Sequence, residues 1–214
     1  MDDRQLADRF CDTWRRCAGS QAQPQPVWEM LQRRYREPHR HYHNLNHLAQ
    51  CLGELDLASN AVEELDATEL AIWFHDVIYR YGAKDNETMS AQAFRDLAAP
   101  HMPVVFVERV CEFIIATQHT GSAQDGGEAF MVDIDLSGFG LPWEGYLADS
   151  NALRREAPDV SDEQYYGGKL RFLDGLLGWK NLFQTDFFSK RLEQRARENI
   201  KRYSADLRAR GFGA

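Results

Sequence analysis

The sequence predicts an all-α protein, a single-domain helical bundle over residues 1–214. Apolar residues recur three or four positions apart in most segments, which is the period of a helix that buries one face. No segment alternates apolar and polar residues as a half-buried strand does. With 214 residues, 43% of them hydrophobic, the chain is long enough to bury one core of ordinary size.

The first half of the chain gives the clearest helical pattern. Residues 2–17 carry Leu6, Phe10, Trp14 and Cys17 on one face, and residues 19–26 end that helix with glycine and proline. The next helix repeats the spacing from Val27 until Pro38 breaks it. Further helices are predicted from 42 to 57, from 66 to between 79 and 82, from 85 to 97, and from 104 to about 121.

The second half continues the bundle after a polar, glycine-rich loop over residues 121–127. Helices are predicted over residues 142–156, 162–177 and 185–210. Gly167 and Gly168 interrupt the second of these, and because each costs about 1 kcal/mol relative to alanine, they predict close packing or a bend. The helices of 142–210 are expected to complete a core that lies over about 38–140.

Charge and cysteine content exclude several classes of protein. The formal charge of -8 argues against a general nucleic-acid or acidic-membrane binder. Residues 190–210 hold eight basic and three acidic residues, which we interpret as a solvated helix face, with a nucleic-acid face as the alternative. Four cysteines without a C-x-x-C motif indicate reduced thiols in a cytoplasmic protein, and no apolar signal or membrane span is expected. Nothing indicates an oligomeric state.

Histidines and acids gather at two places in the first half of the chain. His43 and His47 are four residues apart, which in a helix places them on one face, about 6 Å apart. His75 and Asp76 follow the apolar run 70–74, which would bury them, and a buried His-Asp pair needs a partner. Imidazole and carboxylate together suit a divalent cation, so the sequence predicts a metal site.

These motifs resemble the HD superfamily of metal-dependent phosphohydrolases, in which a histidine, a His-Asp doublet and a distant aspartate bind metal. The string Tyr42-His43-Asn44-x-x-His47 is also similar to one in cyclic nucleotide phosphodiesterases, where the second histidine binds metal and the first donates a proton to the leaving group. A group of small bacterial proteins known as predicted HD phosphohydrolases is similar over three motifs, Pro38-x-Arg40-x-Tyr42-His43-Asn44, Phe74-His75-Asp76-x-x-Tyr79 and Asp85-Asn86-Glu87-x-x-Ser90-Ala91. The resemblance covers most of the chain and implies an HD-type helical fold with the metal site between central helices.

The resemblance also implies individual roles. His43 is the implied proton donor, unless it binds the metal itself. Asp133 and Asp135 lie about 200° apart around a helix, so only one can face a metal, and the resemblance of Asp135-Leu136-Ser137 favours Asp135. Whether one or two metals bind stays open. The implied metal ligands are His47, His75, Asp76 and Asp135.

Three further residues are candidates for the site. Arg40 is expected to contact a substrate phosphate, because guanidinium matches phosphate geometry, with a solvated helix face as the alternative. Glu87 is expected either to cap its helix or to orient the attacking water or a substrate hydroxyl. His119, at a helix end, is expected to be structural because the dipole favours a cation there, and a ligand for a second metal is the alternative.

The expected function is hydrolysis of a small phosphate ester, with a nucleotide as the leading substrate class. The resemblance implies this activity, whereas spacing alone predicts only a metal site. The expected cofactor is a divalent ion (Mn, Mg, Fe, Co, Ni or Zn), and neither nucleic acid nor membrane is an expected partner. Two other classes stay open: a module that binds metal or nucleotide without turnover, and a di-iron oxygenase, which needs more histidines than His101 and His119 supply.

Overall fold

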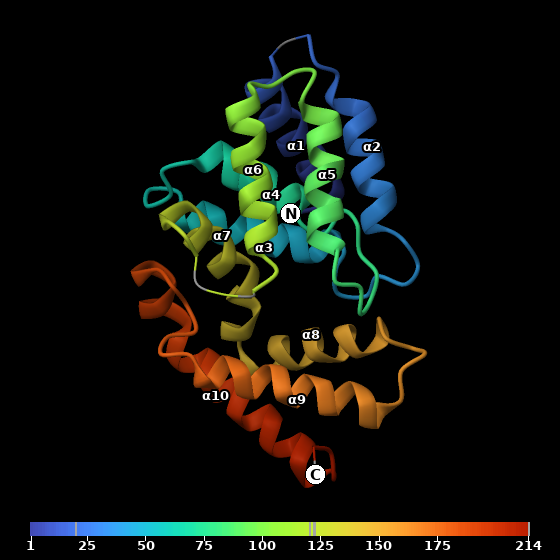
Figure 1. The fold of residues 1–214 in the computed structure, drawn as a ribbon, viewed down its shortest axis with the longest axis vertical. Coiled ribbons are helices and arrows are strands. Elements are labelled where there is room, and N and C mark those ends of the chain that lie inside the picture. Colours follow the sequence, from blue (N-terminus) through green and yellow to red (C-terminus); the bar gives the residue numbers. More distant parts are fainter. Residues whose placement is uncertain (20, 120, 122, 214) are drawn as a thin grey trace. The chain divides into compact units, whose positions relative to one another are not determined.

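The computed structural model describes residues 1–19, 21–119, 121 and 123–213. Within these ranges the chain forms ten α-helices, one short 3-10 helix and no β-strand (Figure 1). The predicted all-α class is therefore confirmed. The chain divides into two compact units, residues 1–135 and residues 136–214, and each is described by itself. The single domain over residues 1–214 stays a prediction.

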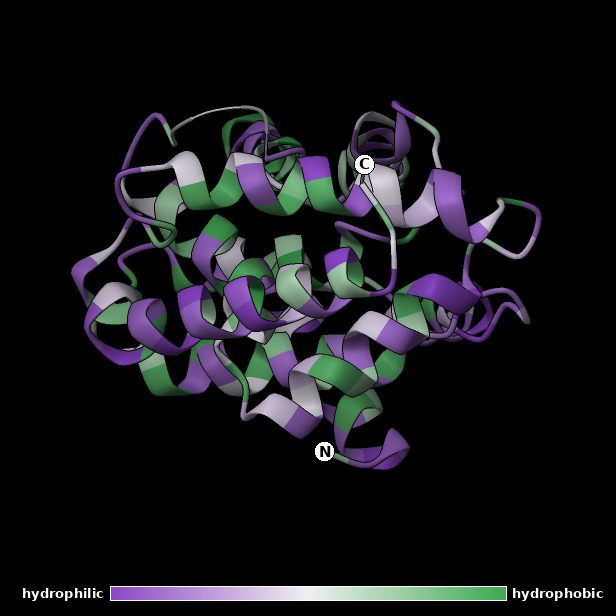
Figure 2. Ribbon diagram, turned by 90° about the horizontal axis from the view of Figure 1, so that it is seen from below, coloured by the Kyte–Doolittle hydropathy of each residue, from purple (hydrophilic) through white to green (hydrophobic). Residues whose placement is uncertain are grey.

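The first unit contains all the residues expected to bind metal. Figure 2 shows hydrophobic and hydrophilic residues interleaved along the helices, as in helices that bury one side. In Figure 1, α5 and α6 run side by side, and they pack on each other. The helices are α1 (Asp3–Ala18), α2 (Pro24–Tyr35), α3 (Leu45–Ala58), α4 (Leu65–Phe74), α5 (Asn86–Ala98), α6 (Val104–Ala116) and α7 (Gly126–Leu136), whose last residue begins the second unit.

Helix α4 is the core of this unit. It packs against α1, α3, α5 and α6, and its residues 70–74 have no exposed surface. This run is apolar on every side, as a helix surrounded by other helices requires. The rings of Phe10 and Trp28 meet Trp73 edge-on, at centroid distances of 5.5 and 6.0 Å. The packing of α4 therefore fixes the position of the residues that directly follow Phe74.

A buried ion pair joins α1 to α4. Arg9 donates from Nε and Nη2 to the two carboxylate oxygens of Glu69, at 2.9 and 3.1 Å. The Thr13 hydroxyl donates to the same carboxylate at 2.7 Å, and Glu69 is only 5% exposed. A bidentate pair with a third donor satisfies a carboxylate that burial would otherwise destabilise.

The second unit holds the 3-10 helix η1 (Ser137–Gly140), α8 (Trp143–Arg155), α9 (Asp162–Gly178) and α10 (Asp186–Ala209). Helix α10 packs against the other three elements, and its predicted apolar stripe, from Phe188 to Leu207, is buried. Asn199 of α10 donates to the carbonyls of Phe139 and Leu141, at 2.9 and 2.8 Å. These bonds attach α10 to the turn that follows α7 in the chain.

Some predicted helix boundaries are wrong. The helix predicted from residue 42 begins at Leu45, because Asn44 is extended and its side chain accepts from the Asn46 amide at 2.8 Å. The helix predicted to reach residues 79–82 ends at Phe74. The predicted loop 121–127 ends earlier, because Asp125 accepts from two amides of the first turn of α7, while Ser122 lies outside the described residues. Gly167 and Gly168 lie within α9.

Close packing at these two glycines, one of the two expectations, is not observed in α9. The nearest atoms to a Cβ added at Gly167 or Gly168 belong to the Arg171 guanidinium, at 3.7 and 3.8 Å. Those distances are ordinary van der Waals contacts with a flexible side chain. The glycines are therefore not required by a neighbouring helix of the second unit.

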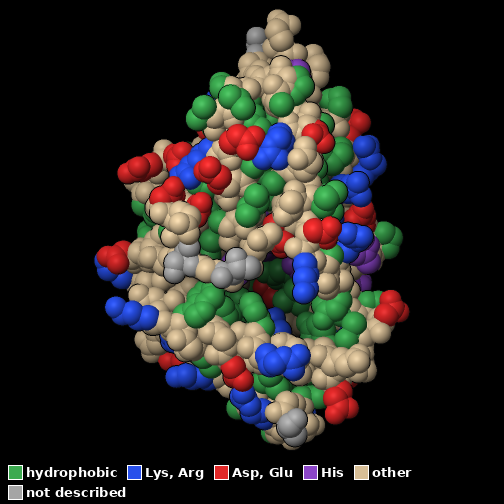
Figure 3. Space-filling view, in the orientation of Figure 1, with side chains coloured by type: hydrophobic (Ala, Val, Ile, Leu, Met, Phe, Trp, Pro, Cys, Tyr) green, Lys and Arg blue, Asp and Glu red, His purple; other side chains and the backbone are tan. Residues whose placement is uncertain are grey.

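Charged side chains of both signs share the surface. On the face in Figure 3, acidic and basic groups are intermixed. On α10, four of the basic residues pair with acids: Lys190 with Asp186, Arg197 with Glu193, Arg208 with Asp174 and Arg210 with Asp206. This pairing fits a solvated helix face. Among the described helices, none is both long and apolar enough to cross a membrane.

The Arg9–Glu69 pair predicts a large effect of a single substitution. Glu69→Ala leaves the partly buried Arg9 guanidinium without its bidentate partner, and we expect the free energy of unfolding to fall by about 3 kcal/mol. Urea unfolding measures this. Asp12→Ala is the control, because it removes an exposed pair with Arg15 on the same helix and should cost less than about 1 kcal/mol. Equal losses in the two variants would contradict the assigned role.

Candidate metal centre

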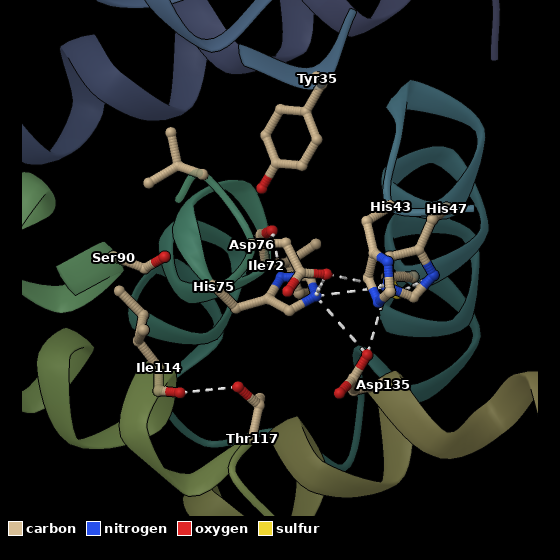
Figure 4. Close-up of polar contacts among 12 residues, drawn as sticks. Tyr35, His43, His47, Ile72, His75, Asp76, Ser90, Ile114, Thr117 and Asp135 are labelled. Carbon is tan, nitrogen blue, oxygen red and sulfur yellow. Dashed lines mark hydrogen bonds and ion pairs between the residues drawn. The ribbon is translucent and has the colours of Figure 1, made fainter. Parts of the chain in front are cut away.

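Three of the four predicted ligands meet at one point of the first unit. His47 lies in the first turn of α3, His75 directly follows α4, and Asp135 lies at the end of α7. Figure 4 shows their side chains pointing toward one another from these three places. One ligand atom from each lies within 4.8 Å of the others, a grouping that could hold a metal ion.

The spacing of the ligand atoms matches a shared ion. His47 Nε2 is 3.2 Å from both His75 Nε2 and Asp135 Oδ1, and His75 Nε2 is 3.5 Å from Asp135 Oδ1. Atoms bound at about 2.1 Å to one ion lie about 3.0 Å apart at octahedral angles and about 3.4 Å apart at tetrahedral angles. The spacing of the two ring nitrogens and the carboxylate oxygen is therefore compatible with one shared ion.

Asp76 also faces this point. Its Oδ2 lies 2.9 Å from His75 Nε2 and 3.8 Å from His47 Nε2. The predicted ligand thus lies beside the other three, although the doublet follows α4 and is not part of it. An oxygen at this place can join the shell of an ion held by the two histidines.

The end of α4 fixes which nitrogen of His75 faces the other ligands. Its Nδ1 lies 2.9 Å from the Ile72 carbonyl, which can only accept, so Nδ1 carries the proton. The lone pair is then on Nε2, the atom that faces His47, Asp76 and Asp135 in Figure 4. Metal-binding histidines typically have such a carbonyl partner on the other nitrogen.

Electrostatics inside the group favour a bound cation. Burial opposes a charged imidazole, yet the Asp76 and Asp135 carboxylates hold the pKa of His75 well above its ordinary value. Burial would also raise the carboxyl pKa values, but the surrounding histidines lower both, with His75 acting most on Asp76 and His119 on Asp135. A divalent ion can supply the positive charge that a proton on His75 otherwise provides.

Arg40 has a different place from the expected one. Its side chain is fully buried, and its guanidinium donates to the carbonyls of Asp76 at 2.6 Å and Val77 at 3.1 Å. It also donates to the His43 carbonyl at 3.3 Å and the Glu37 carboxylate at 3.0 Å. Since these acceptors occupy the guanidinium inside the protein, we correct the expected phosphate contact: Arg40 braces the backbone on both sides of the centre.

His43 lies just before α3 and not on its first turn. Its ring stacks on Tyr79 with centroids 3.9 Å apart, and it lies 6.1 Å from the His47 ring. The group of possible ligands in the described residues does not include His43. Its charge nevertheless lowers the pKa of Asp76, so it lies within electrostatic reach of the centre.

Glu87 lies in the first turn of α5, as predicted. Burial raises the pKa of its carboxyl, and the negative charges of Asp76 and Asp135 raise it further, while His119 acts in the opposite direction. The Glu87 carboxyl therefore lies within electrostatic reach of Asp76, Asp135 and His119.

The choice of Asp135 over Asp133 agrees with the geometry. Asp135 lies in the metal-binding group, whereas Asp133 is fully buried within α7. His119 is close to this group too, because its Nε2 lies 2.9 Å from Asp135 Oδ2. His101 is exposed in the turn before α6.

Sequence reasoning missed the residues that support these groups. Cys51, one turn after His47, is fully buried with its sulfur 3.8 Å from His47 Nδ1. Asn86 pairs through its amide with both backbone groups of Arg80, and Ser90 contacts those of Ile78. Asn86 and Ser90 belong to a motif quoted for the resemblance, so the signal was present, but nothing in the sequence indicated that backbone groups were their partners.

The resemblance to the HD superfamily is supported only by the sequence motifs, because comparison with known proteins found no match. No family model, curated protein or solved structure matches this chain.

The geometry predicts that a divalent ion stabilises the protein through His75. At an ion concentration about 100 times the Kd, the gain is about 2.7 kcal/mol, or a rise in Tm of roughly 5–10 °C. Thermal unfolding with and without Mn²⁺ or Zn²⁺ measures the shift. His75→Ala should lose it, whereas the control His101→Ala should retain it. A shift that survives His75→Ala would assign the ion to another site.

Arg40 gives a second prediction. Arg40→Met removes the donors from buried carbonyls and a carboxylate, so we expect unfolding free energy to fall by about 3 kcal/mol and metal affinity to fall with it. Arg36→Met is the control, because Arg36 is exposed and pairs with Asp3 at the surface. Urea unfolding and metal titration distinguish the two. Normal stability and normal metal affinity in Arg40→Met would contradict the bracing role.

Proposed function

We propose that the protein is a metal-dependent phosphohydrolase that acts on a small phosphate ester such as a nucleotide. The observation that carries this proposal is the 3.2–3.5 Å spacing of the ligand atoms of His47, His75 and Asp135. The same residues carry the resemblance to the HD superfamily. The geometry supports a metal site, and the resemblance adds the reaction.

A bound divalent ion would lower the pKa of a coordinated water and neutralise the charge of the phosphoryl group. The protein's own residues have the remaining tasks. His43 suits proton donation to the departing oxygen, since it lies beside the centre but outside the group of ligand atoms. Its stacking on Tyr79 fixes the plane of the ring and therefore the direction of the proton.

Glu87 suits a position next to the attacking water. Its carboxyl is half-buried, and its pKa is raised by burial and by the carboxylates of Asp76 and Asp135. A carboxyl whose proton is held more tightly than usual is a better base when ionised. Orientation of the water is thus the role we propose for Glu87.

The charge of the first unit favours a small substrate bound through the ion. Residues 1–135 contain 12 basic and 22 acidic residues, a formal charge of -10, and Arg40 is occupied inside the protein. A phosphate group therefore needs the bound ion as its main positive partner. A long polyanion would also be repelled by the net negative charge of this unit.

The two other classes predict different observations. A module that binds nucleotide without using a metal can lose any of the ligands, so the complete set of His47, His75, Asp76 and Asp135 argues against that form of the module. A di-iron oxygenase predicts two iron atoms per chain and consumption of oxygen. It also needs more histidines than His101 and His119 supply.

The test is metal-dependent hydrolysis of p-nitrophenyl phosphate, its bis ester and a panel of nucleotides, after removal of bound metal and addition of single ions. We expect His43→Ala to bind metal as the wild type does and to lose kcat by a factor of about 100 to 10,000. His101→Ala should keep full activity. Loss of metal in His43→Ala would make His43 a ligand. A metal-loaded wild type without turnover on the panel would favour the binding module.

A further inference from the structure

His119 combines three unusual features at one residue. Its φ is 53°, and among the described residues it is the only non-glycine with positive φ. Its Nδ1 is buried with no hydrogen-bond partner among the described residues. Its Nε2 lies 2.9 Å from Asp135 Oδ2. A left-handed backbone and an unsatisfied buried nitrogen both cost stability, and such costs cluster at functional sites.

The neighbouring carboxylate indicates which nitrogen of His119 carries the proton, because an ionised Asp135 oxygen can only accept a hydrogen bond. A buried N–H without an acceptor costs more than a buried lone pair, because the donor has lost its hydrogen bond to water. The proton of the neutral ring is therefore on Nε2, and Nε2 donates to Asp135. A protonated Nε2 donates to the carboxylate, so this contact is a hydrogen bond that holds Asp135 Oδ2.

The backbone conformation at the end of α6 positions the His119 imidazole beside Asp135. Helix α6 ends at Ala116, and the amides of Gln118 and His119 still donate to the carbonyls of Ile115 and Ala116. Figure 4 shows Thr117, two residues before His119, at the end of α6 on the side of Asp135. The positive φ at His119 then turns the chain out of the helical path.

Asp135 needs such a partner because the torsion of a carboxylate about its last bond is broad. Its Oδ1 faces His47 Nε2 at 3.2 Å and His75 Nε2 at 3.5 Å, while its Oδ2 is held by His119. With one oxygen fixed, the other is directed at the two ring nitrogens. In the same way, the Ile72 carbonyl accepts from His75 Nδ1 and so orients the Nε2 of that ring.

We infer that His119 is a positioning residue for the metal ligand Asp135, and that the strained backbone at residue 119 is retained for this purpose. The inference rests on the metal site of the proposed function. Partners of this kind typically change metal affinity by a factor of 10 to 100. A structural histidine at a helix end would affect folding and leave the affinity of the folded protein unchanged.

The test compares His119→Asn with the wild type. Asparagine tolerates the left-handed backbone but is too short to hold Asp135 as the imidazole does. Mn²⁺ binding is followed by the EPR signal of the free ion, and Tm is measured on the metal-free proteins. We expect His119→Asn to bind one ion 10 to 100 times more weakly, with a metal-free Tm within about 3 °C of the wild type.

Two further variants keep the test decisive. His119→Gly removes the backbone strain altogether and should show the same loss of affinity, whichever way asparagine affects folding. Gln118→Ala is the control, because it changes the adjacent side chain at the same helix end and should bind Mn²⁺ as the wild type does.

The possible outcomes separate this inference from the proposed function. Wild-type affinity in both His119 variants would overturn the positioning role. Two ions in the wild type and one in the variants would also overturn it, because His119 would then be a ligand. A wild type that binds no ion would instead contradict the metal site itself, and the proposed function with it.

Discussion

The buried end of α4 is the constraint on which the site depends. A helix leaves its last carbonyls without intrahelical partners, and inside a protein they must find donors. Here the Tyr35 hydroxyl donates to the Trp73 carbonyl at 3.1 Å, and Arg40 donates to the carbonyls of Asp76 and Val77. The His75 ring donates to the carbonyl of Ile72. Because these bonds hold the backbone that carries the doublet, satisfying the helix end also orients the metal-binding groups.

The candidate metal centre brings several hydrogen-bond acceptors together in one place. Two ring nitrogens and the carboxylates of Asp76 and Asp135 converge, and their contacts link these atoms to one another. The Asp76 and Asp135 carboxylates raise the pKa of His75 despite its burial, so the group favours positive charge. His119 holds the outer oxygen of Asp135 at 2.9 Å, which directs the inner oxygen toward the two ring nitrogens. We interpret this as a preorganised centre, in which the backbone strain at residue 119 is compensated elsewhere in the fold.

The sequence predicted the helices well because a one-sided apolar pattern depends only on local spacing. It failed at Leu45 and Phe74, where caps decide the boundary: Asn44 was readable as a cap, whereas the partners of the α4 end, Tyr35 and Arg40, are distant in sequence. A partner for His75 was anticipated from the residues, because a His-Asp pair behind an apolar run needs one. The resemblance to the HD superfamily, and not the spacing, named His47 and Asp135 as further ligands. Arg40 was misread, since the same guanidinium suits phosphate and backbone carbonyls alike, and only its surroundings distinguish them.

The central claim is that His47, His75 and Asp135 share one divalent ion. A crystal of the protein soaked in Mn²⁺ and measured at a wavelength near the manganese edge tests it most directly. The account predicts an anomalous peak about 2.0–2.3 Å from His47 Nε2, His75 Nε2 and an oxygen of Asp135. Full-occupancy manganese elsewhere on the chain, with these three side chains hydrogen-bonded to one another and to water, would contradict it.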